Sequence, residues 1–141
     1  MDRNQLKIME EIISAVMKTG IDVDYVPNAT LRLTFHAKED YGDGHAPSEI
    51  SITGHPIENL HIMPPTLIPS MIASSFPYSE EQVFMKDGLS GLTDSGVEIT
   101  PAIKKLLEKS WNQMTSQCSK AEKAALAAVA PYERSEKKVP H

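Results

Sequence analysis

Apolar and polar residues alternate with a helical period at the start of the chain and with a strand period after it. Leu6, Met9 and Ile13 recur three and four residues apart until Gly20, which predicts an amphipathic N-terminal helix. Every second residue is then apolar in three short runs, a pattern typical of β-strands joined in an antiparallel meander. The runs cover residues 21–25, 31–36 and 49–55.

Successive residues of a strand point to opposite faces of a sheet, so the alternation predicts a core face and a solvent face. The core face should carry the apolar set: Ile21, Val23, Tyr25, Leu31, Leu33, Phe35, Ile50 and Ile52. The other face carries the polar set: Asp22, Asp24, Arg32, Thr34, His36, Glu49, Ser51, Thr53 and His55. Turn geometry places Asp24 opposite or near Arg32. The second hairpin places His36 opposite either Glu49 or Ser51.

Proline and glycine interrupt the pattern in the middle of the chain. Residues 59–63 could add a fourth short strand, but the prolines that follow prevent a regular ladder or a long helix. A short buried helix is expected near Pro69. Residues 80–85 fit either a helical turn or a strand, and the glycines at positions 88, 91 and 96 predict loops.

The C-terminal region predicts further helices. Thr100 and Pro101 form a helix start, and an apolar stripe follows to Cys118. Ser119 and Glu122 offer a second capping box, so the helix should end near Ser119 and restart before ending at Pro131. The expected fold class is α+β, with an N-terminal helix, a three- to four-stranded antiparallel meander and C-terminal helices packed on one sheet face. Residues 1–130 should form a single domain and residues 131–141 a disordered tail.

Composition and charge narrow the possible functions. The chain has 141 residues, of which 40% are hydrophobic, and this suits one globular domain. No apolar run approaches the roughly 18 residues of a membrane span, and no signal peptide is evident, so we expect a cytoplasmic protein. Residues 1–100 contain 6 Lys and Arg against 15 Asp and Glu, whereas residues 101–141 contain 8 against 4. Because phosphate backbones attract basic surfaces, this acidic body argues against direct nucleic-acid binding.

Candidate catalytic residues gather around the second hairpin. His36 oriented by Glu49 could act as a general base, and His45 could fold back toward His36 from the 38–48 loop. The nearby acids Glu39, Asp40 and Asp43 could then complete a His/carboxylate metal site. The loop lacks the ligand spacing of a calcium-binding EF-hand, so we expect no metal and no cofactor. The chain also lacks the short motifs of nucleotide-binding proteins, zinc proteases and α/β-hydrolases.

The stretch FHAKEDYGDGHAPSEISITGHP resembles part of the ubiquitin-conjugating and RWD-type domains. In those domains a strand, a D-Y-P loop with a second proline, another strand and an H-P pair follow one another. This chain departs from the pattern at Gly42, where the family has proline, and no cysteine follows Pro56 where a catalytic one would lie. The resemblance therefore implies a non-catalytic, protein-binding relative.

Structural features outweigh chemical ones in this sequence. The small residues from Ala121 to Val129 have too little bulk to anchor a core, which is typical of a surface that binds another protein. We expect a protein-binding or regulatory module, such as an inhibitor, immunity protein or chaperone-like adaptor, that acts through its acidic body. Its partner would be another protein or a second copy bound through the C-terminal helix, and not a membrane. The expected binding residues are Asp24, Arg32, His36, Asp40, Asp43, His45, Glu49 and His55.

The alternative function is enzymatic. It would be a small hydrolase or a metal-assisted enzyme centred on His36, Glu49 and the 38–48 loop. A concave pocket where His36 and Glu49 converge would favour the enzyme, whereas a flat or ridged patch would favour the binding module.

Overall fold

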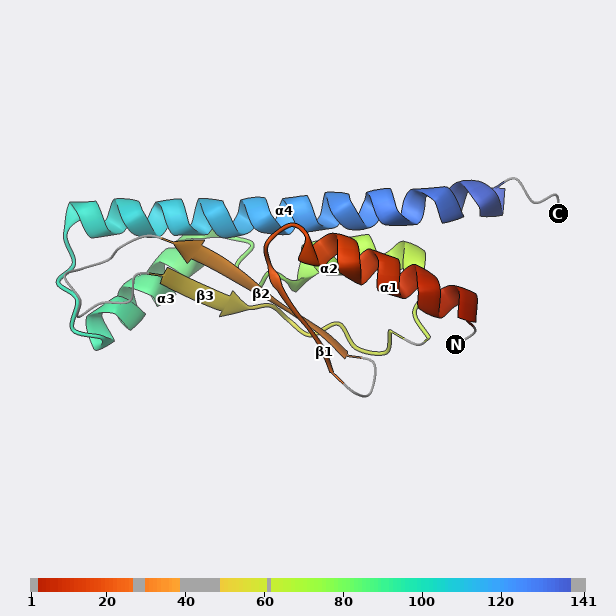
Figure 1. Ribbon diagram of the computed structural model, residues 1–141. Helices are drawn as coiled ribbons and strands as arrows, with labels where there is room; N and C mark the ends of the chain where they lie inside the picture. Colours follow the sequence, from red (N-terminus) through yellow and green to blue (C-terminus); the bar gives the residue numbers. More distant parts are fainter. Residues whose placement is uncertain (1–2, 27–29, 39–48, 61, 138–141) are drawn as a thin grey trace.

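The computed structural model describes residues 3–26, 30–38, 49–60 and 62–137 and has an α+β fold (Figure 1). Its elements in chain order are α1 (Arg3–Met17), β1 (Asp22–Val26), β2 (Thr30–Lys38), β3 (Glu49–Thr53), the 3₁₀ helix η1 (Pro65–Leu67), α2 (Ile68–Ser75), α3 (Glu81–Asp94) and α4 (Pro101–Lys137). α4 runs along the length of the molecule and contacts α1, α2, α3 and β2. The predicted fold class, with an N-terminal helix, an antiparallel meander and C-terminal helices, is confirmed.

β2 is the central strand of a three-stranded antiparallel sheet, with β1 and β3 at its edges. The register pairs Asp24 with Arg32, as predicted, and pairs His36 with Ser51. The apolar face of β2 is fully buried, whereas the described residues of its polar face are half-buried or exposed. The alternation therefore identified the core side of the sheet correctly. The buried residues of β2 are Leu31, Leu33, Phe35 and Ala37.

The meander has three strands, and the possible fourth strand at residues 59–63 does not form in the part of that segment that the structure describes. Ile57 forms an isolated antiparallel bridge to Leu31 instead, with N···O distances of 2.8 and 2.9 Å. Asn59 then adopts a φ of 63°, and its carbonyl accepts two N–H groups of the turn that follows. This left-handed residue bends the chain before a ladder can extend. α2 begins as expected, with Pro69 in its first turn.

α3 forms where Gly88 and Gly91 predicted loops, so that prediction was wrong at these two glycines and correct at Gly96. The helix passes through both Gly88 and Gly91. At Gly88, a Cβ atom would lie 2.8 Å from a side-chain carbon of Leu107 on α4, so glycine allows the two helices to pack closely. The third glycine, Gly96, has a φ of 85° just beyond the helix, the left-handed position that commonly ends helices.

Matched substitutions at these two glycines should change stability in opposite directions. Ala is favoured over Gly inside a helix by about 1 kcal/mol. Gly91 has open space around its Cα, so Gly91→Ala should stabilise the protein by about 0.5–1 kcal/mol. Gly88→Ala should lower the free energy of unfolding by about 1 kcal/mol, because the overlap with buried Leu107 outweighs the helical preference. Urea unfolding measures both, and stabilisation by Gly88→Ala would show that Leu107 moves aside easily.

α4 is one continuous helix, so the predicted restart near Ser119 and the predicted end at Pro131 were both wrong. The small residues of its second half pack against α1, and three of them are completely buried: Ala121, Ala125 and Val129. Their small size allows the helices to approach closely, so this segment belongs to the core after all. Beyond Pro131, the Tyr132 hydroxyl donates a hydrogen bond to the Glu11 carboxylate of α1. Residues 131–137, the first part of the predicted tail, therefore belong to α4. Residues 138–141 lie outside the described part of the chain.

Candidate functional site

Asp24 and Arg32, two of the predicted binding residues, meet on the polar face of the sheet. Arg32 Nη2 lies 3.4 Å from Asp24 Oδ2. The Arg32 side chain is 50% exposed and the Asp24 side chain is 72% exposed. Because solvent screens an exposed ion pair, such a contact contributes less than about 1 kcal/mol. The pair fits an ordinary solvated sheet surface.

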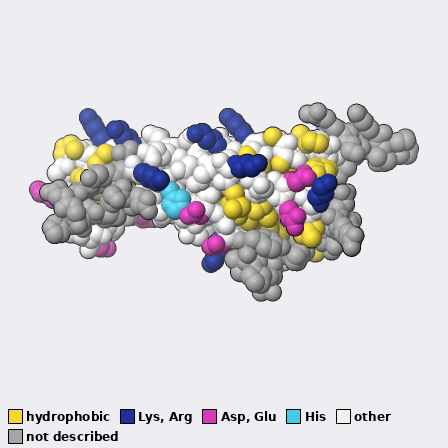
Figure 2. All heavy atoms as spheres, viewed as in Figure 1, with side chains coloured by type: hydrophobic (Ala, Val, Ile, Leu, Met, Phe, Trp, Pro, Cys, Tyr) yellow, Lys and Arg dark blue, Asp and Glu magenta, His cyan; other side chains and the backbone are white. Residues whose placement is uncertain are grey.

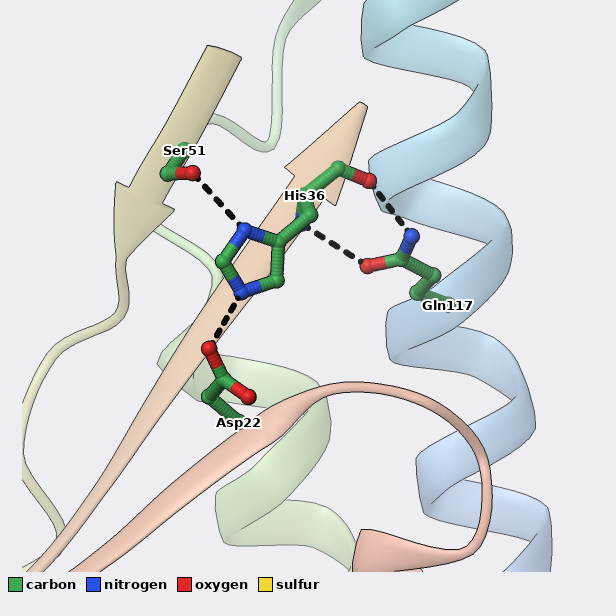
Figure 3. Close-up of polar contacts among 4 residues, drawn as sticks. All are labelled: Asp22, His36, Ser51 and Gln117. Carbon is green, nitrogen blue, oxygen red and sulfur yellow. Dashed lines mark hydrogen bonds and ion pairs between the residues drawn. The ribbon is translucent and has the colours of Figure 1, made fainter. Parts of the chain in front are cut away.

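His36 lies at the centre of a polar cluster built from all three strands (Figure 3). Its Nδ1 atom is 2.7 Å from Ser51 Oγ on β3, and its Nε2 atom is 2.7 Å from Asp22 Oδ2 on β1. Glu49, the expected partner of His36, is paired with Lys38 in the register. The carboxylate beside the imidazole therefore comes from Asp22.

The hydrogen-bond partners determine where the proton lies on the neutral imidazole. A carboxylate only accepts hydrogen bonds, so Nε2 of His36 must carry the hydrogen that is donated to Asp22. Nδ1 then has a free lone pair and accepts the hydroxyl hydrogen of Ser51. This order of groups matches a Ser-His-Asp triad with the two ring nitrogens exchanged. The ring is positioned to act as a base toward the Ser51 hydroxyl.

Two glutamines of α4 hold the backbone of β2 at this site. The pairing between β1 and β2 stops at the Asp22–Thr34 pair. The backbone groups of β2 beyond Thr34 therefore have no strand partner on the β1 side. The Gln117 side-chain amide accepts from the His36 N–H at 3.0 Å and donates to the His36 carbonyl. One turn earlier, the Gln113 side chain accepts from the Lys38 N–H at 3.1 Å. The two glutamines thus replace a neighbouring strand and fix the position of His36.

A polar pocket of about 420 Å³ lies beside the imidazole. Its lining residues come from the turn before β1, the first residue of β1, the end of β2 and the middle of α4: Gly20, Asp22, His36, Lys38, Gln113 and Gln117. Ser51 is not among them. The pocket is therefore on the α4 side of the ring, whereas the Ser51 hydroxyl approaches the ring from β3.

Other predicted site residues lie apart from this cluster. The His55 side chain is exposed, and its backbone N–H donates to the Ser75 carbonyl at 2.6 Å. Asp40, Asp43 and His45 lie outside the described residues, as does most of the 38–48 loop. Within the described ranges, no three His, Cys, Asp or Glu side chains are close enough together to hold a metal ion.

Cys118 is the single cysteine of the chain and is buried, as its position on the apolar stripe predicted. Burial raises the pKa of its thiol, and the negative charge of Glu122 raises it further. Because the thiolate is the reactive form, Cys118 is an inert core residue at neutral pH.

A second surface of interest lies on α1, where apolar side chains remain open. Leu6 and Met17 are 44% and 54% exposed, and half-buried Ile13 lies between them. Together with Met9, Glu10 and Ser14 they line an open pocket of about 320 Å³. Figure 2 shows hydrophobic side chains gathered on this face over α1. We call Leu6, Ile13 and Met17 the open stripe.

A shallow groove of about 770 Å³ lies between α1 and α4, next to the open stripe. Small residues of both helices form part of its lining, together with charged residues of α1. The lining residues are Lys7, Glu10, Glu11, Ser14, Ala15, Lys18, Ala124, Ala127 and Ala128. Glu10 and Ser14 line both the groove and the pocket of the open stripe, so the two form one continuous surface.

Comparisons with known proteins give no match to a protein family, to a curated protein or to a solved structure. The geometry of the described residues must therefore carry any statement of function. Among the residues that the structure describes, no helix is both long enough and apolar enough to cross a membrane.

Proposed function

We propose that the protein is a protein-binding module, of the regulator, inhibitor or adaptor kind, whose binding surface is the outer side of α1. The observation that carries this proposal is the width of the apolar face of α1. With about 3.6 residues per turn, the buried residues and the open stripe form neighbouring rows on the helix. The core covers the row of Ile8, Ile12 and Val16 and leaves the row of Leu6, Ile13 and Met17 open.

Apolar surface supports this location better than the acidic residues of the sheet do. Two exposed acids of the sheet already have partners, Asp22 with His36 and Asp24 with Arg32. Exposed ion pairs contribute little, whereas each large apolar side chain that becomes fully buried contributes about 1.5–3 kcal/mol. The open stripe is therefore the stronger source of binding energy.

The proposed partner is an amphipathic helix with acidic residues beside its apolar stripe. Its apolar side chains would cover Leu6, Ile13 and Met17, and its backbone would pass over the small residues of the groove. Two lysines of α1 line that groove, and Lys120 and Lys123 lie one turn before its alanines on the exposed side of α4. Against these four lysines stand three acids, Glu10 and Glu11 of the lining and Glu122 of α4. The surplus of lysines complements an acidic partner.

A second copy of this chain is a less suitable partner for the same surface. The buried small residues of α4 already pack against α1, and among the described side chains of that half of α4 the large apolar residue left exposed is Leu126, at 47%. Two copies of α1 packed through their open stripes in antiparallel order would bring Glu10, which lies beside the stripe near the middle of α1, close to Glu10 of the other copy. Like charges at that position oppose self-association.

Site-specific photo-crosslinking in an extract of the native host tests the proposal. Met17 is replaced by the crosslinking residue p-benzoylphenylalanine, and Asn112, exposed on α4, is replaced in the same way as the control position. We expect crosslinks from position 17, with partner peptides that show helical apolar spacing and net negative charge. Leu6→Glu should weaken this capture at least about tenfold, and Ser116→Glu should leave it unchanged.

The other outcomes decide against the proposal. Equal capture from positions 17 and 112 would mean non-specific contact, and capture of this chain by itself would identify a homodimer. Circular dichroism of Leu6→Glu should match that of the unchanged protein, because Leu6 is already 44% exposed. If Leu6→Glu lost helix signal, its reduced capture would reflect unfolding. The crosslink from position 17 in the otherwise unchanged chain would then be the deciding measurement.

A further inference from the structure

We propose that Ser51 is a nucleophile activated by His36, and that it accepts the acyl group of small, reactive carboxylic esters. The Ser51 hydroxyl is 2.7 Å from His36 Nδ1, within the reach that a general base needs. His36 Nε2 is in turn held by the Asp22 carboxylate at 2.7 Å. This site is separate from the α1 surface and does not depend on the proposed function.

The ring nitrogen that faces Ser51 is the basic one. Asp22 requires a hydrogen on Nε2, so the lone pair of the neutral imidazole lies on Nδ1 and points to the hydroxyl. The His36 side chain is 21% exposed, and the Gln117 amide bonds both the backbone N–H and the backbone carbonyl of His36. Asp22 and Gln117 are therefore positioning residues that hold one tautomer in one place.

Ser51 is accessible from solvent. It lies on β3, which is an edge strand, and the residue is exposed. Both backbone groups of His36 bond to Gln117, so His36 and Ser51 form a non-hydrogen-bonded pair across the two strands. In such a pair the Ser51 N–H points away from β2, and no described residue accepts its hydrogen bond. This N–H can donate to the oxyanion that forms during acyl transfer.

The proposed reaction follows from these positions. Ser51 Oγ attacks the ester carbonyl carbon while its proton passes to His36 Nδ1, and the Asp22 carboxylate stabilises the resulting imidazolium. The bond from the carbonyl carbon to the leaving oxygen then breaks, this oxygen takes the proton from His36 and departs as an alcohol or phenol, and the acyl group stays on Oγ. Water attacks the acyl carbon in the second half and gives a proton to His36. The bond from the acyl carbon to Oγ then breaks, Oγ takes that proton back from His36, and the product leaves as a carboxylic acid that ionises in water. A single oxyanion donor predicts acylation that is selective but slow.

A fluorophosphonate probe tests the nucleophile, because its adduct on serine is stable. In this reaction the Oγ–P bond forms, the P–F bond breaks, fluoride leaves and the proton goes to His36. Peptide mapping by mass spectrometry should show Ser51 labelled about 100-fold faster than Ser116, an exposed serine on α4 with no histidine partner in the described structure. The labelling rate of Ser51 should rise with pH, as expected when a neutral base activates the hydroxyl.

Variants separate activation from simple exposure. Ser51→Ala should remove the fast adduct, and His36→Gln should reduce labelling at position 51 to the rate of Ser116. Asp22→Asn should slow it and alter the pH profile, because an amide can donate to Nε2 and so favour the tautomer with hydrogen on Nδ1. Asp22→Glu should restore part of the rate. Equal labelling of Ser51 and Ser116 in the unchanged protein would overturn the proposal, as would a Ser51 rate that is independent of both pH and His36.

Discussion

Phe35→Ala is expected to lower the free energy of unfolding by about 3–5 kcal/mol, as measured by urea denaturation. Phe35 is completely buried on the central strand of the sheet. Its ring packs edge-to-face on Phe76 with ring centroids 5.1 Å apart, and Phe76 packs in the same way on Tyr78. Removing the ring leaves a cavity and breaks an aromatic chain that joins β2 to the region before α3.

The expected loss is large because the surroundings of Phe35 cannot easily collapse. A Cβ atom on Gly54 would lie 3.1 Å from the Phe35 ring and 2.8 Å from the Ser75 carbonyl oxygen, so the backbone already packs tightly there. Thr34→Ala is the matched control on the neighbouring position of the same strand, where the side chain is half-buried and faces the polar side. It should cost less than about 1 kcal/mol. Similar losses at both positions would contradict a sheet with only one buried face.

The sheet was predictable because its evidence is local. Strand alternation fixes which side chains share a face, so only registers that keep the two apolar sets together are allowed. Asp24 and Arg32 were therefore paired correctly, and the pairing of His36 was reduced to two candidates before the structure resolved it as Ser51. The α+β fold class followed from the same alternation of apolar and polar residues.

The complete polar cluster was harder to predict. Asp22 is directly opposite Thr34, and it reaches His36 as a diagonal neighbour two residues further along β2. The general rule that diagonal neighbours interact could have identified this contact from the register. Gln117 left no such signal, because it contacts His36 across 81 residues of sequence and depends on how α4 packs on the sheet.

The helices show where local patterns mislead. Glycine lowers helical preference by about 1 kcal/mol, and that cost is smaller than the packing energy that a close helix crossing provides. Gly88 is therefore helical and packs on Leu107. The same reasoning applies to the alanines of α4, whose small size indicated an unanchored surface but allows close contact with α1. Small residues are ambiguous in sequence because both open surfaces and the tightest contacts use them.

Ala125→Leu distinguishes these two interpretations of the second half of α4. If the segment is packed against α1, the larger side chain has no space at the completely buried Ala125 and must force α1 and α4 apart. The free energy of unfolding should then fall by about 2–3 kcal/mol, the cost of strong overpacking in a core. Ala127→Leu is the matched control, because the same change two residues later falls on an exposed position of the same helix.

Ala127→Leu should change stability by less than about 0.5 kcal/mol in the same urea experiment, since leucine and alanine are both good helix formers. A near-neutral Ala125→Leu would show that the two helices are not tightly packed, and it would return the segment to the role of an open binding surface. If both substitutions destabilised equally, the effect would come from a general change in α4 and could not be assigned to its contact with α1. Only a large loss at Ala125 together with a negligible change at Ala127 agrees with a helix pair whose separation is set by its smallest side chains.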